Sequence, residues 1–504
     1  MPKLVRVKAL FRRLPSSAFL VFVLLAQGIF GSFGITEPFS DGRLHWNWGP
    51  SFWLLHAQQI NSVGLVGARF GVVSDVVIRG GKAVANGFYQ SHPQLIGPVV
   101  ALWTRLFGYE EWSVRLLALA LTMATTVFLW LAIRKLFSTR VANTTIVLWA
   151  LMPIIAIYGR KLDQEPLVLF FLALALFGFA RARQTTGRPW IFFFGLICAC
   201  LSDWSGFVFA ACLSAACLFF GKKEDRRFVV AGGAAILVGL ALLAVQLVVE
   251  RTVTHSAIDL VSLYQFRSAD AAPSVAAWFW KQWQYLVDNF GMLAAGIFPL
   301  TVWFFVGRSS VERGEDRLSR ALFGAIVVGQ LLYLAVVPQA AAIHGYFQYY
   351  FSLPLAVGLS LLFERMRFRR CGAVSAAVLF VFCLAVQSVG SVLLWGQIRH
   401  SWYGDATDVA LLREIRAYPQ TATVQALGGP KGWFDNPNIH YYARRNISLA
   451  VPGELPFPDV YVVAEESADA LIERLRVTNS KPFPTPSKRD CSNHFCIVET
   501  YGHP

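Results

Sequence analysis

The sequence predicts a mainly α protein, in which a polytopic membrane bundle of about eleven helices precedes a small C-terminal α/β domain. The 504 residues are 56% apolar and only 15% charged, and their mean hydropathy is +0.50, which is unlike a soluble domain. Apolar runs of the length that a membrane-spanning helix needs, about 17–25 residues, recur along most of the chain. The predicted spans are 15–35, 113–133, 141–158, 165–181, 189–203, 204–220, 228–249, 290–306, 321–341, 346–363 and 371–395.

Basic residues orient this bundle, because Lys and Arg near the ends of spans stay on the cytoplasmic side. About half of the 45 Lys and Arg residues fall in short segments on one side, such as "MPKLVRVKALFRR", "GKKEDRR" and "ERMRFRR". The pattern holds only if "PQLIGPVVALWTRLF" (93–107) does not cross, so we predict an interfacial or re-entrant helix there. The loop 36–112, the loop 250–289 and the C-terminal domain are then predicted to lie outside the cytoplasm, on a multi-pass protein of the cell (inner) membrane.

The charge balance excludes one class of function. The net charge of +15 is mostly a topology signal, because the basic residues are spread over many loops and form no single basic face. We therefore expect no nucleic-acid partner.

The chain is expected to divide into a membrane domain (1–395) and an α/β domain (396–504). In the second, "DATDVALLREIRAY" and "SADALIERLRV" are predicted to be helices, and "TATVQAL", "DVYVVAE" and "HFCIVET" to be strands. Cys491 and Cys496 lie on the predicted oxidising side, which favours a disulfide. A zinc site with His494 is the alternative, although two sulfurs and one imidazole fall short of the usual four ligands.

The segment "AIYGRKLDQEPLVLFF" (156–171) places several ionisable residues between two apolar runs. Burying charge in hydrocarbon costs several kcal/mol, so this segment is either a turn at a water interface or the wall of a site. A site is favoured for Asp163. For Glu165 a first-turn helix charge is equally favoured, because Pro166 suits a helix start.

The predicted spans contain almost no ionisable residue at mid-depth, whereas acidic candidates gather at one interface: Asp41, Asp163, Glu165 and Asp203. A transporter or flippase of lipid-linked or small polar substrates needs a path across the membrane. Catalysis on a lipid-linked substrate needs a site at one surface only. The distribution favours catalysis, and transport is the alternative.

The stretch "FYQSHPQLIGPVVALWTRLFGYEEWSVRLLALAL" (88–121) resembles the signature of polytopic membrane glycosyltransferases of the GT-C fold. It is similar to glycosyltransferase family 39, which includes protein O-mannosyltransferases and aminoarabinose lipid A transferases. In that group a His-Pro or Lys-Pro step opens an interfacial helix, and an "LFG" turn, an acid and an Arg lead into the second span. The matching residues are His92-Pro93, Leu106-Phe107-Gly108, Glu110/Glu111 and Arg115.

Two later segments extend the resemblance over about 1–395. Family members carry an Arg and then an Asp after the third span, matched here by Arg160 and Asp163. The segment "HGYFQYYFSLPL" (344–355) resembles the His- and Tyr-rich start of a late span, although an ordinary aromatic belt at the interface is at least as good an explanation of it.

The resemblance implies transfer of a sugar from a polyprenyl-phosphate donor to a lipid, glycan or protein acceptor at the outer face, with inversion. It places the general base at Asp41 in "ITEPFSDGRLHW", with Glu37 as the second choice. Cations would bind the donor phosphate. The candidate substrate-binding residues are Asp163, Arg160, His92, Glu165, Lys161, Arg115, His344 and Tyr346. No cofactor is required in this family, and a divalent cation beside the acids stays open.

Two positions depart from the family pattern. Gly42 stands where many members have a Glu after the first Asp. Asp203-Trp204 in "LSDWSG" stands where a Lys-Gly step often follows the fifth span, and an Asp cannot pair with a phosphate as a Lys does. These departures leave open a non-catalytic GT-C-like protein.

Overall fold

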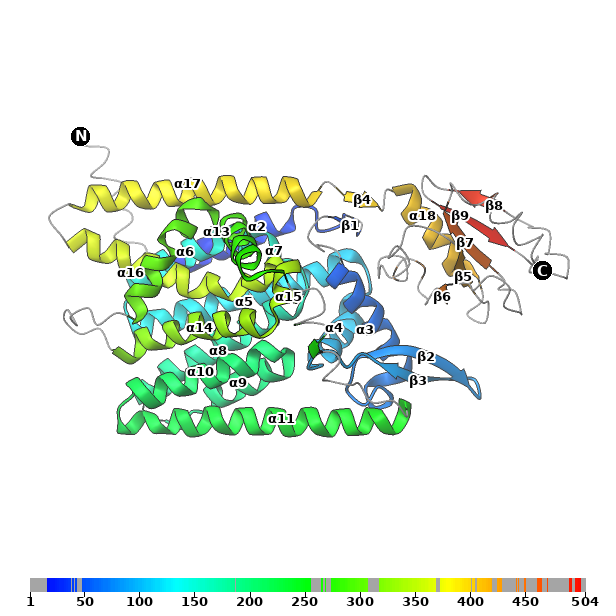
Figure 1. The fold of residues 1–504 in the computed structure, drawn as a ribbon, viewed down its shortest axis with the longest axis horizontal. Coiled ribbons are helices and arrows are strands. Elements are labelled where there is room, and N and C mark those ends of the chain that lie inside the picture. The colour runs from blue at the N-terminus through cyan, green and yellow to red at the C-terminus, as the bar shows by residue number, and fades with distance from the viewer. Residues whose placement is uncertain are drawn as a thin grey trace.

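The structure, a computed structural model, is a bundle of long helices with a small sheet domain beyond one end (Figure 1). We call that end of the bundle the domain end. The described residues are 16–37, 39, 41–42, 48–185, 187–254, 264–265, 268, 273–306, 317–368, 372–399, 401–403, 406–418, 424–427, 441, 443, 448–449, 460–464, 469, 489–491 and 495–499.

Helix is found at each of the eleven predicted spans. The helices are α2 (Ser16–Ser32), α5 (Glu111–Leu136), α6 (Thr139–Leu151), α7 (Pro153–Tyr158), α8 (Gln164–Thr185), α9 (Trp190–Ser202), α10 (Trp204–Phe220), α11 (Arg226–Thr254), α13 (Val275–Val306), α14 (Arg317–Val336), α15 (Pro338–Ile343), η3 (Gly345–Phe351), α16 (Ser352–Phe368) and α17 (Gly372–Arg399). Within the described residues, six helices are long and apolar enough to cross a membrane, and several apolar helices are shorter. The prediction of a mainly α, multi-pass membrane bundle is confirmed.

Some predicted spans are interrupted near the domain end. The helix predicted at 141–158 is divided at Met152, because Pro153 has no N–H to continue the hydrogen bonds of α6. Pro338 separates α14 from α15 in the same way. Helix α13 is kinked at Gly291, whose φ of +79° suits glycine. The short elements α7, α15 and η3 follow the two prolines. Tyr158 of α7 and Tyr346 of η3 contribute to the candidate site described below.

The segment 48–107 forms a compact unit at the domain end. It contains α3 (Trp48–Gly67), the antiparallel hairpin β2 (Val73–Arg79) and β3 (Lys82–Phe88), and α4 (Ile96–Phe107). The 12 residues of α4 extend about 18 Å, which is shorter than the roughly 30 Å of membrane hydrocarbon. This length is compatible with an interfacial or re-entrant helix at 93–107, which stays a prediction. The hairpin itself was not predicted, although Gly80 and Gly81 with positive φ are a typical hairpin turn.

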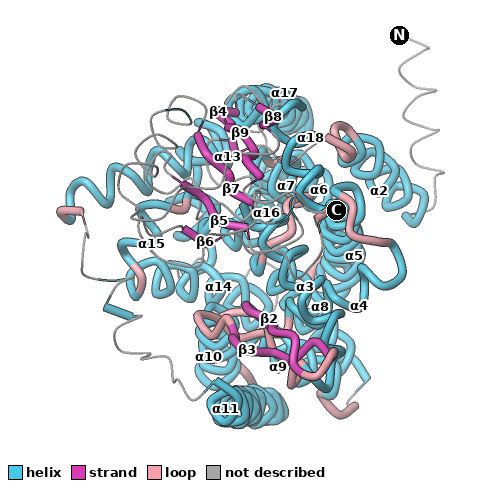
Figure 2. Tube along the Cα trace, turned by 90° about the vertical axis from the view of Figure 1, so that its right-hand side faces the viewer, coloured by secondary structure: helices cyan, strands magenta, loops and turns pink. Residues whose placement is uncertain are grey.

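The C-terminal domain combines α18 (Ala406–Glu414) with a five-stranded sheet of order β6-β5-β7-β9-β8, and Figure 2 views this sheet in front of the bundle. The strands are β5 (Val424–Leu427), β6 (Ser448–Leu449), β7 (Val460–Ala464), β8 (Arg489–Cys491) and β9 (Phe495–Glu499). The three predicted strands and the first predicted helix are confirmed. The second helix, in "SADALIERLRV", lies almost entirely outside the described residues.

The predicted disulfide between Cys491 and Cys496 is present, between residues paired across β8 and β9. The alternative of a zinc site at these cysteines is therefore wrong, because a disulfide leaves no thiolate to bind the metal. His494, its third candidate ligand, lies outside the described residues.

Two hydrophobic cores hold the molecule together. The larger lies between the bundle helices. The smaller joins the segment 39–118 to the C-terminal domain and includes Phe39, Trp53, Ile96, Tyr441 and Ile497. The C-terminal domain is therefore packed onto the same unit that carries the predicted catalytic segment.

Candidate active site

The turn between α7 and α8 buries a Lys and two carboxylates. The Nζ of Lys161 lies 3.0 Å from Oδ2 of Asp163. The Oδ1 of Asp163 accepts hydrogen bonds from Nε1 of Trp53, at 3.3 Å, and from the backbone N–H of Gln164, at 3.1 Å. Asp163 therefore satisfies the first N–H of α8 and also pairs with a buried cation, so the turn serves both as a helix start and as a polar cluster.

This cluster is incompletely satisfied. Lys161 is 2% exposed, and its ammonium makes no aligned hydrogen bond in the described residues despite its closeness to Asp163. Glu165 is 6% exposed, and its Oε2 has no hydrogen-bond partner there. A buried polar atom without a partner costs about 1–3 kcal/mol, and more when it is charged. Natural proteins keep such atoms mainly where they have a function.

Aromatic rings close the cluster on another side. The Nζ of Lys161 lies 3.7 Å from the ring centroid of Tyr346 and 5.7 Å from that of Tyr158, which are cation–π distances. The ring of His344 lies 5.2 Å from that of Tyr346. The structure thus brings the predicted residues Tyr346 and His344 to the Lys161 cluster.

Helix α13 holds these rings in place through the backbone of α15 and η3. Along one face of its first half, side-chain N–H and O–H groups donate to backbone carbonyls at 2.8–3.0 Å: Trp278 to Pro338, Gln282 to Ala341, Tyr285 to Ala342 and Asn289 to Gly345. This row of bonds attaches α13 to the backbone of α15 and η3. It explains how a broken helical segment keeps a fixed position.

Asp203 joins the site through His92. Its Oδ1 lies 2.8 Å from Nδ1 of His92, and its Oδ2 accepts hydrogen bonds from the N–H of Ser205 and the hydroxyl of Tyr333, at 3.0 and 3.2 Å. Asp203 is thus a helix cap for α10 and the partner of a predicted site residue. The departure from the family pattern has a physical explanation: the carboxylate orients the imidazole.

A stack of rings supports His92 from the other side. Tyr89 stacks on His92 and on His56, with centroids 6.1 and 6.0 Å apart. The Nδ1–H of His56 donates to the carbonyl of Val73 at 2.7 Å. Burial lowers the pKa of His56 to about 4, so the imidazole is neutral at pH 7. The sequence analysis did not identify this stack.

The carboxylate of Glu250 holds the segment around His92. Its Oε2 accepts hydrogen bonds from Nε2 of Gln90, at 2.9 Å, and of Gln94, at 3.1 Å. These two amides flank His92 in "QSHPQ", and Gln94 also accepts the N–H of Val72. The sequence analysis missed Glu250. An acid at the end of the apolar run of α11, together with two Gln around a His, was the available signal.

Arg115 and Arg160 lie together at the C-terminal end of α2. The Nη1 of Arg115 donates to the carbonyls of Gly34, at 3.2 Å, and Ile35, at 2.9 Å, and also to that of Glu37. Nη1 of Arg160 donates to the carbonyl of Phe33. These carbonyls belong to the turn that follows α2, and a cation close to a helix C-terminus is stabilising.

The structure thus gives both guanidinium groups backbone partners, so their predicted contact with phosphate stays a prediction. Burial, and the neighbouring Arg115, lower the pKa of Arg160 to about 10, while Glu37 acts in the opposite direction. The guanidinium therefore stays charged at neutral pH.

Asp41, the predicted base, lies in β1 (Asp41–Gly42), which pairs antiparallel with β4 (Ser401–Tyr403). The side chain of Asp41 lies outside the described part of the structure. The segment that follows does reach the cluster, since a Cβ at Gly49 would lie 2.8 Å from Oδ2 of Asp163. Only glycine leaves this carboxylate enough room.

An apolar groove of about 570 Å³ opens beside Arg160. Its lining comes from α2, α5, α6, α7 and α17 and includes Phe22, Phe30, Leu119 and Val392.

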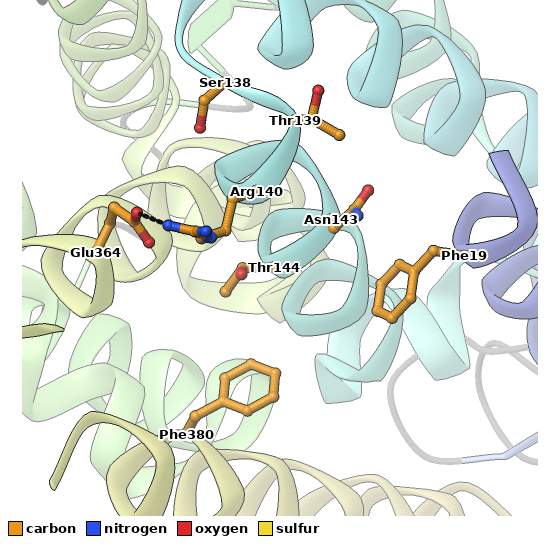
Figure 3. A pocket seen from close by; sticks show the side chains of 8 residues that line it. All are labelled: Phe19, Ser138, Thr139, Arg140, Asn143, Thr144, Glu364 and Phe380. Atoms are coloured by element: carbon orange, nitrogen blue, oxygen red, sulfur yellow. Dashed lines mark hydrogen bonds and ion pairs between the residues drawn. The ribbon is translucent and has the colours of Figure 1, made fainter. Parts of the chain in front are cut away.

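A pocket of about 650 Å³ surrounds the ion pair of Arg140 and Glu364, 2.8 Å apart (Figure 3). It lies between the start of α6 and the last turn of α16, away from the domain end, so it is separate from the candidate site.

Metal binding finds no support in the side chains that the structure describes. Among them, no group of three or more His, Cys, Asp or Glu residues is arranged to hold a metal ion. Whether a divalent cation takes part stays an open prediction.

A known protein family matches part of this chain. The sequence model of the dolichyl-phosphate-mannose-protein mannosyltransferase family matches residues 91–249, which include His92, Arg115, Lys161 and Asp203. Comparison of the whole sequence with curated proteins finds no match.

Solved structures are similar over nearly the whole chain. ArnT from Cupriavidus metallidurans bound to undecaprenyl phosphate has a TM-score of 0.63 at 13% identity, and the match covers 97% of this chain and 99% of that protein. The Archaeoglobus fulgidus oligosaccharyltransferase in complex with Zn and sulfate has a TM-score of 0.56 at 13% identity, with 92% and 70% covered. Oligosaccharyltransferase AglB from the same organism, in complex with an inhibitory peptide and a dolichol-phosphate, has a TM-score of 0.55 at 12% identity, with 89% and 70% covered.

The chain therefore has the GT-C fold of polytopic membrane glycosyltransferases. Within that class, the match with ArnT spans almost the whole length of both chains. The resemblance seen in the sequence is confirmed at the level of fold.

Proposed function

We propose that this protein is a membrane glycosyltransferase that moves a sugar from a polyprenyl-phosphate donor to a lipid, glycan or protein acceptor on the outer face. The observation that carries the proposal is the buried and incompletely satisfied cluster of Lys161, Asp163 and Glu165 at one end of a GT-C bundle. A transporter needs polar groups along a path across the membrane, whereas this cluster sits at one end. The similar structures with undecaprenyl phosphate or dolichol-phosphate support this class of donor.

In the proposed reaction, the acceptor hydroxyl oxygen attacks the anomeric carbon as the bond from that carbon to the phosphate oxygen breaks. The proton of the hydroxyl passes to the carboxylate of Asp41, and the electron pair leaves with the polyprenyl phosphate. A single displacement of this kind inverts the anomeric centre. Glu37, which lies on the same segment, is the second choice of base.

Lys161 is the cation best placed to bind the leaving phosphate. Its ammonium is buried and has hydrogen-bond donors to spare, and a charge-assisted bond is strongest where water is excluded. Its two carboxylate neighbours have oxygens that can accept hydrogen bonds from sugar hydroxyls. Arg160, beside the apolar groove, would meet the phosphate from the lipid side.

The groove beside Arg160 suits the lipid part of such a donor. It is lined mainly by apolar side chains along membrane helices, and it has a guanidinium at one end. An isoprenoid chain that enters the groove from the bilayer exchanges lipid contacts for side-chain contacts, so close packing would hold it there. The groove would thus hold part of the chain while the phosphate stays at the domain end.

The proposal is tested by the glycolipid and glycoprotein profile of cells that carry the wild-type protein, no protein, or the Asp41→Asn variant. We expect one glycosylated product to be absent both without the protein and with Asp41→Asn, although the variant still binds undecaprenyl phosphate. Identical products in all three strains would overturn the transferase assignment. If lipid flux across the membrane then depended on the protein, transport would be the function.

Sidedness has its own test. Cysteines introduced singly at Lys223 and Ser487 should react with a membrane-impermeant reagent from opposite sides, with Ser487 labelled from outside. Labelling of both from outside would contradict the proposed orientation.

A further inference from the structure

The C-terminal domain contacts the segment that carries Asp41 in two places. In the first, β1 (Asp41–Gly42) forms a two-stranded antiparallel sheet with β4 (Ser401–Tyr403), in which Asp41 pairs with Tyr403 and Gly42 with Ser401. In the second, the rings of Phe39 and Tyr441 meet edge to face, with centroids 5.1 Å apart. Both contacts fall within two residues of Asp41.

These contacts are buried and fixed in position. Phe39 is 1% exposed and Tyr441 is 3% exposed. The guanidinium of Arg115 lies over the ring of Phe39, 4.9 Å from its centroid. The ring of Phe39 therefore contacts both the membrane bundle and the C-terminal domain.

Further bonds anchor the domain beside this contact. The hydroxyl of Tyr441 donates to the carbonyl of Tyr109 at 2.6 Å, and the Nη2 of Arg413 lies 3.2 Å from Oε1 of Glu111. Glu111 is the first residue of α5, Tyr109 lies two residues before it, and Arg115 lies about one turn further along the same helix. The domain is thus attached to the same helix start that holds the segment 34–37.

We propose that the C-terminal domain is a positioning device for the catalytic segment, with Tyr441 as the positioning residue; this inference rests on the proposed function of Asp41. In the described part of the chain, Asp41 lies on a strand of only two residues. Proton transfer requires heavy atoms within about 2.6–3.2 Å, and a displacement of about 1 Å can lower a rate by 10²-fold. The domain supplies a strand partner and a ring contact on either side of this residue.

A disulfide tests the strand pairing. Gly42→Cys combined with Ser401→Cys places two cysteines at directly paired positions, where Cα atoms of antiparallel strands lie about 4.5–5.5 Å apart, within disulfide range. We expect the full-length double variant to form this bond on mild oxidation and, in membranes, to keep product formation within about twofold of its reduced form. Each single variant is the control. Failure to form the bond, or loss of product formation on oxidation of the double variant alone, would overturn the proposal.

Variants of Tyr441 test the ring contact. Tyr441→Leu removes the edge-to-face contact and the hydroxyl, and we expect product formation to fall about ten- to a hundredfold while the Kd for undecaprenyl phosphate is unchanged. Tyr441→Phe keeps the ring on Phe39 and should restore most of the activity. Ile497→Val, in the core of the same domain, is the matched control for stability. If Ile497→Val lowers activity as much as Tyr441→Leu, or if Tyr441→Leu weakens donor binding equally, Tyr441 has only a structural role.

Failure of the proposed function can be told apart from failure of the positioning inference. Formation of the Gly42→Cys/Ser401→Cys disulfide is read by mass spectrometry and needs no turnover. If the bond forms but the wild-type protein makes no glycosylated product, the proposed function is wrong and the positioning inference falls with it. If the product is made but the bond does not form, only the positioning inference is wrong.

Discussion

Two groups of buried cations lie near the domain end, and they differ in how their charge is satisfied. Arg115 and Arg160 donate to backbone carbonyls of the turn that follows α2. Lys161 has a carboxylate at 3.0 Å and a ring at 3.7 Å, but no aligned hydrogen bond among the described residues. The fold alone explains the contacts of Arg115, whereas Arg160 also borders the apolar groove. The second group leaves donors and acceptors buried and unused, which is typical of a place where a ligand binds.

The largest effect is expected from Asp41→Asn. The amide keeps the shape but cannot take a proton, so turnover should fall by roughly 10²–10⁴. Binding of undecaprenyl phosphate should change little, because a carboxylate adds no attraction for a phosphate. Glu37→Gln is the matched control and should be mild. Near-normal turnover for Asp41→Asn with an inactive Glu37→Gln would show that Glu37 is the base.

The next effect is on stability and comes from His56, because its burial disfavours the charged imidazole. The unfolded chain binds a proton near pH 6.5, whereas the pKa of His56 in the fold is about 4. Stability is therefore complete above pH 6.5 and falls as the pH drops toward 4, by roughly 3 kcal/mol at 1.36 kcal/mol per pKa unit. Unfolding in detergent should show this slope, and His56→Gln should remove it. An unchanged slope in the variant would assign the effect to other groups.

Lys161→Met and Arg115→Met compare the two groups of cations directly. Lys161→Met should weaken binding of undecaprenyl phosphate by roughly tenfold or more, as expected for loss of a charge-assisted bond of about 1.5–3 kcal/mol. Arg115→Met should leave binding nearly unchanged but lower stability, because carbonyls of 34–37 lose their donor. Calorimetric titration and thermal unfolding measure the two effects. The reverse result would exchange the roles of the two groups.

The smallest effect is expected at Glu250. Glu250→Gln keeps an oxygen that can accept from Gln90 and Gln94 and loses only the charge, so stability should fall by about 1 kcal/mol. Glu250→Leu removes the acceptor altogether, which should lower stability further and reduce product formation through displacement of His92. Equal results for the two variants would mean that the acceptor is not what holds this segment.

The positions of the helices were predictable from the sequence because apolar runs report burial in lipid directly. The polar turn 159–163 could also be identified, since charges between apolar runs are conspicuous. The partners of these charges could not be predicted. His92 and Asp203 are 111 residues apart, and Gln90 and Glu250 are 160 apart. Such pairs depend on how helices pack, and one sequence contains no periodicity that reports it.

For the same reason Asp203 looked like a departure that weakened the assignment. Its sequence position suggested the loss of a phosphate-binding Lys, whereas in the fold it pairs with His92 and caps α10. The attachment of the C-terminal domain to residues 39–42 was equally hidden, because Phe39 and Tyr441 belong to segments with no shared pattern. Contacts between distant segments are where sequence reasoning has least information.

The length of helix α11 has a consequence for a protein that spans a membrane. Its 29 residues extend about 44 Å, whereas the hydrocarbon layer is about 30 Å thick. Figure 1 shows it running along the bundle as far as the hairpin of β2 and β3. Near this far end, Gln246 donates to the carbonyl of Phe70 and Glu250 holds the segment around His92. The length of this helix is fixed. A thicker bilayer would therefore bring the hairpin and His92 closer to the lipid and change their distance from the water layer.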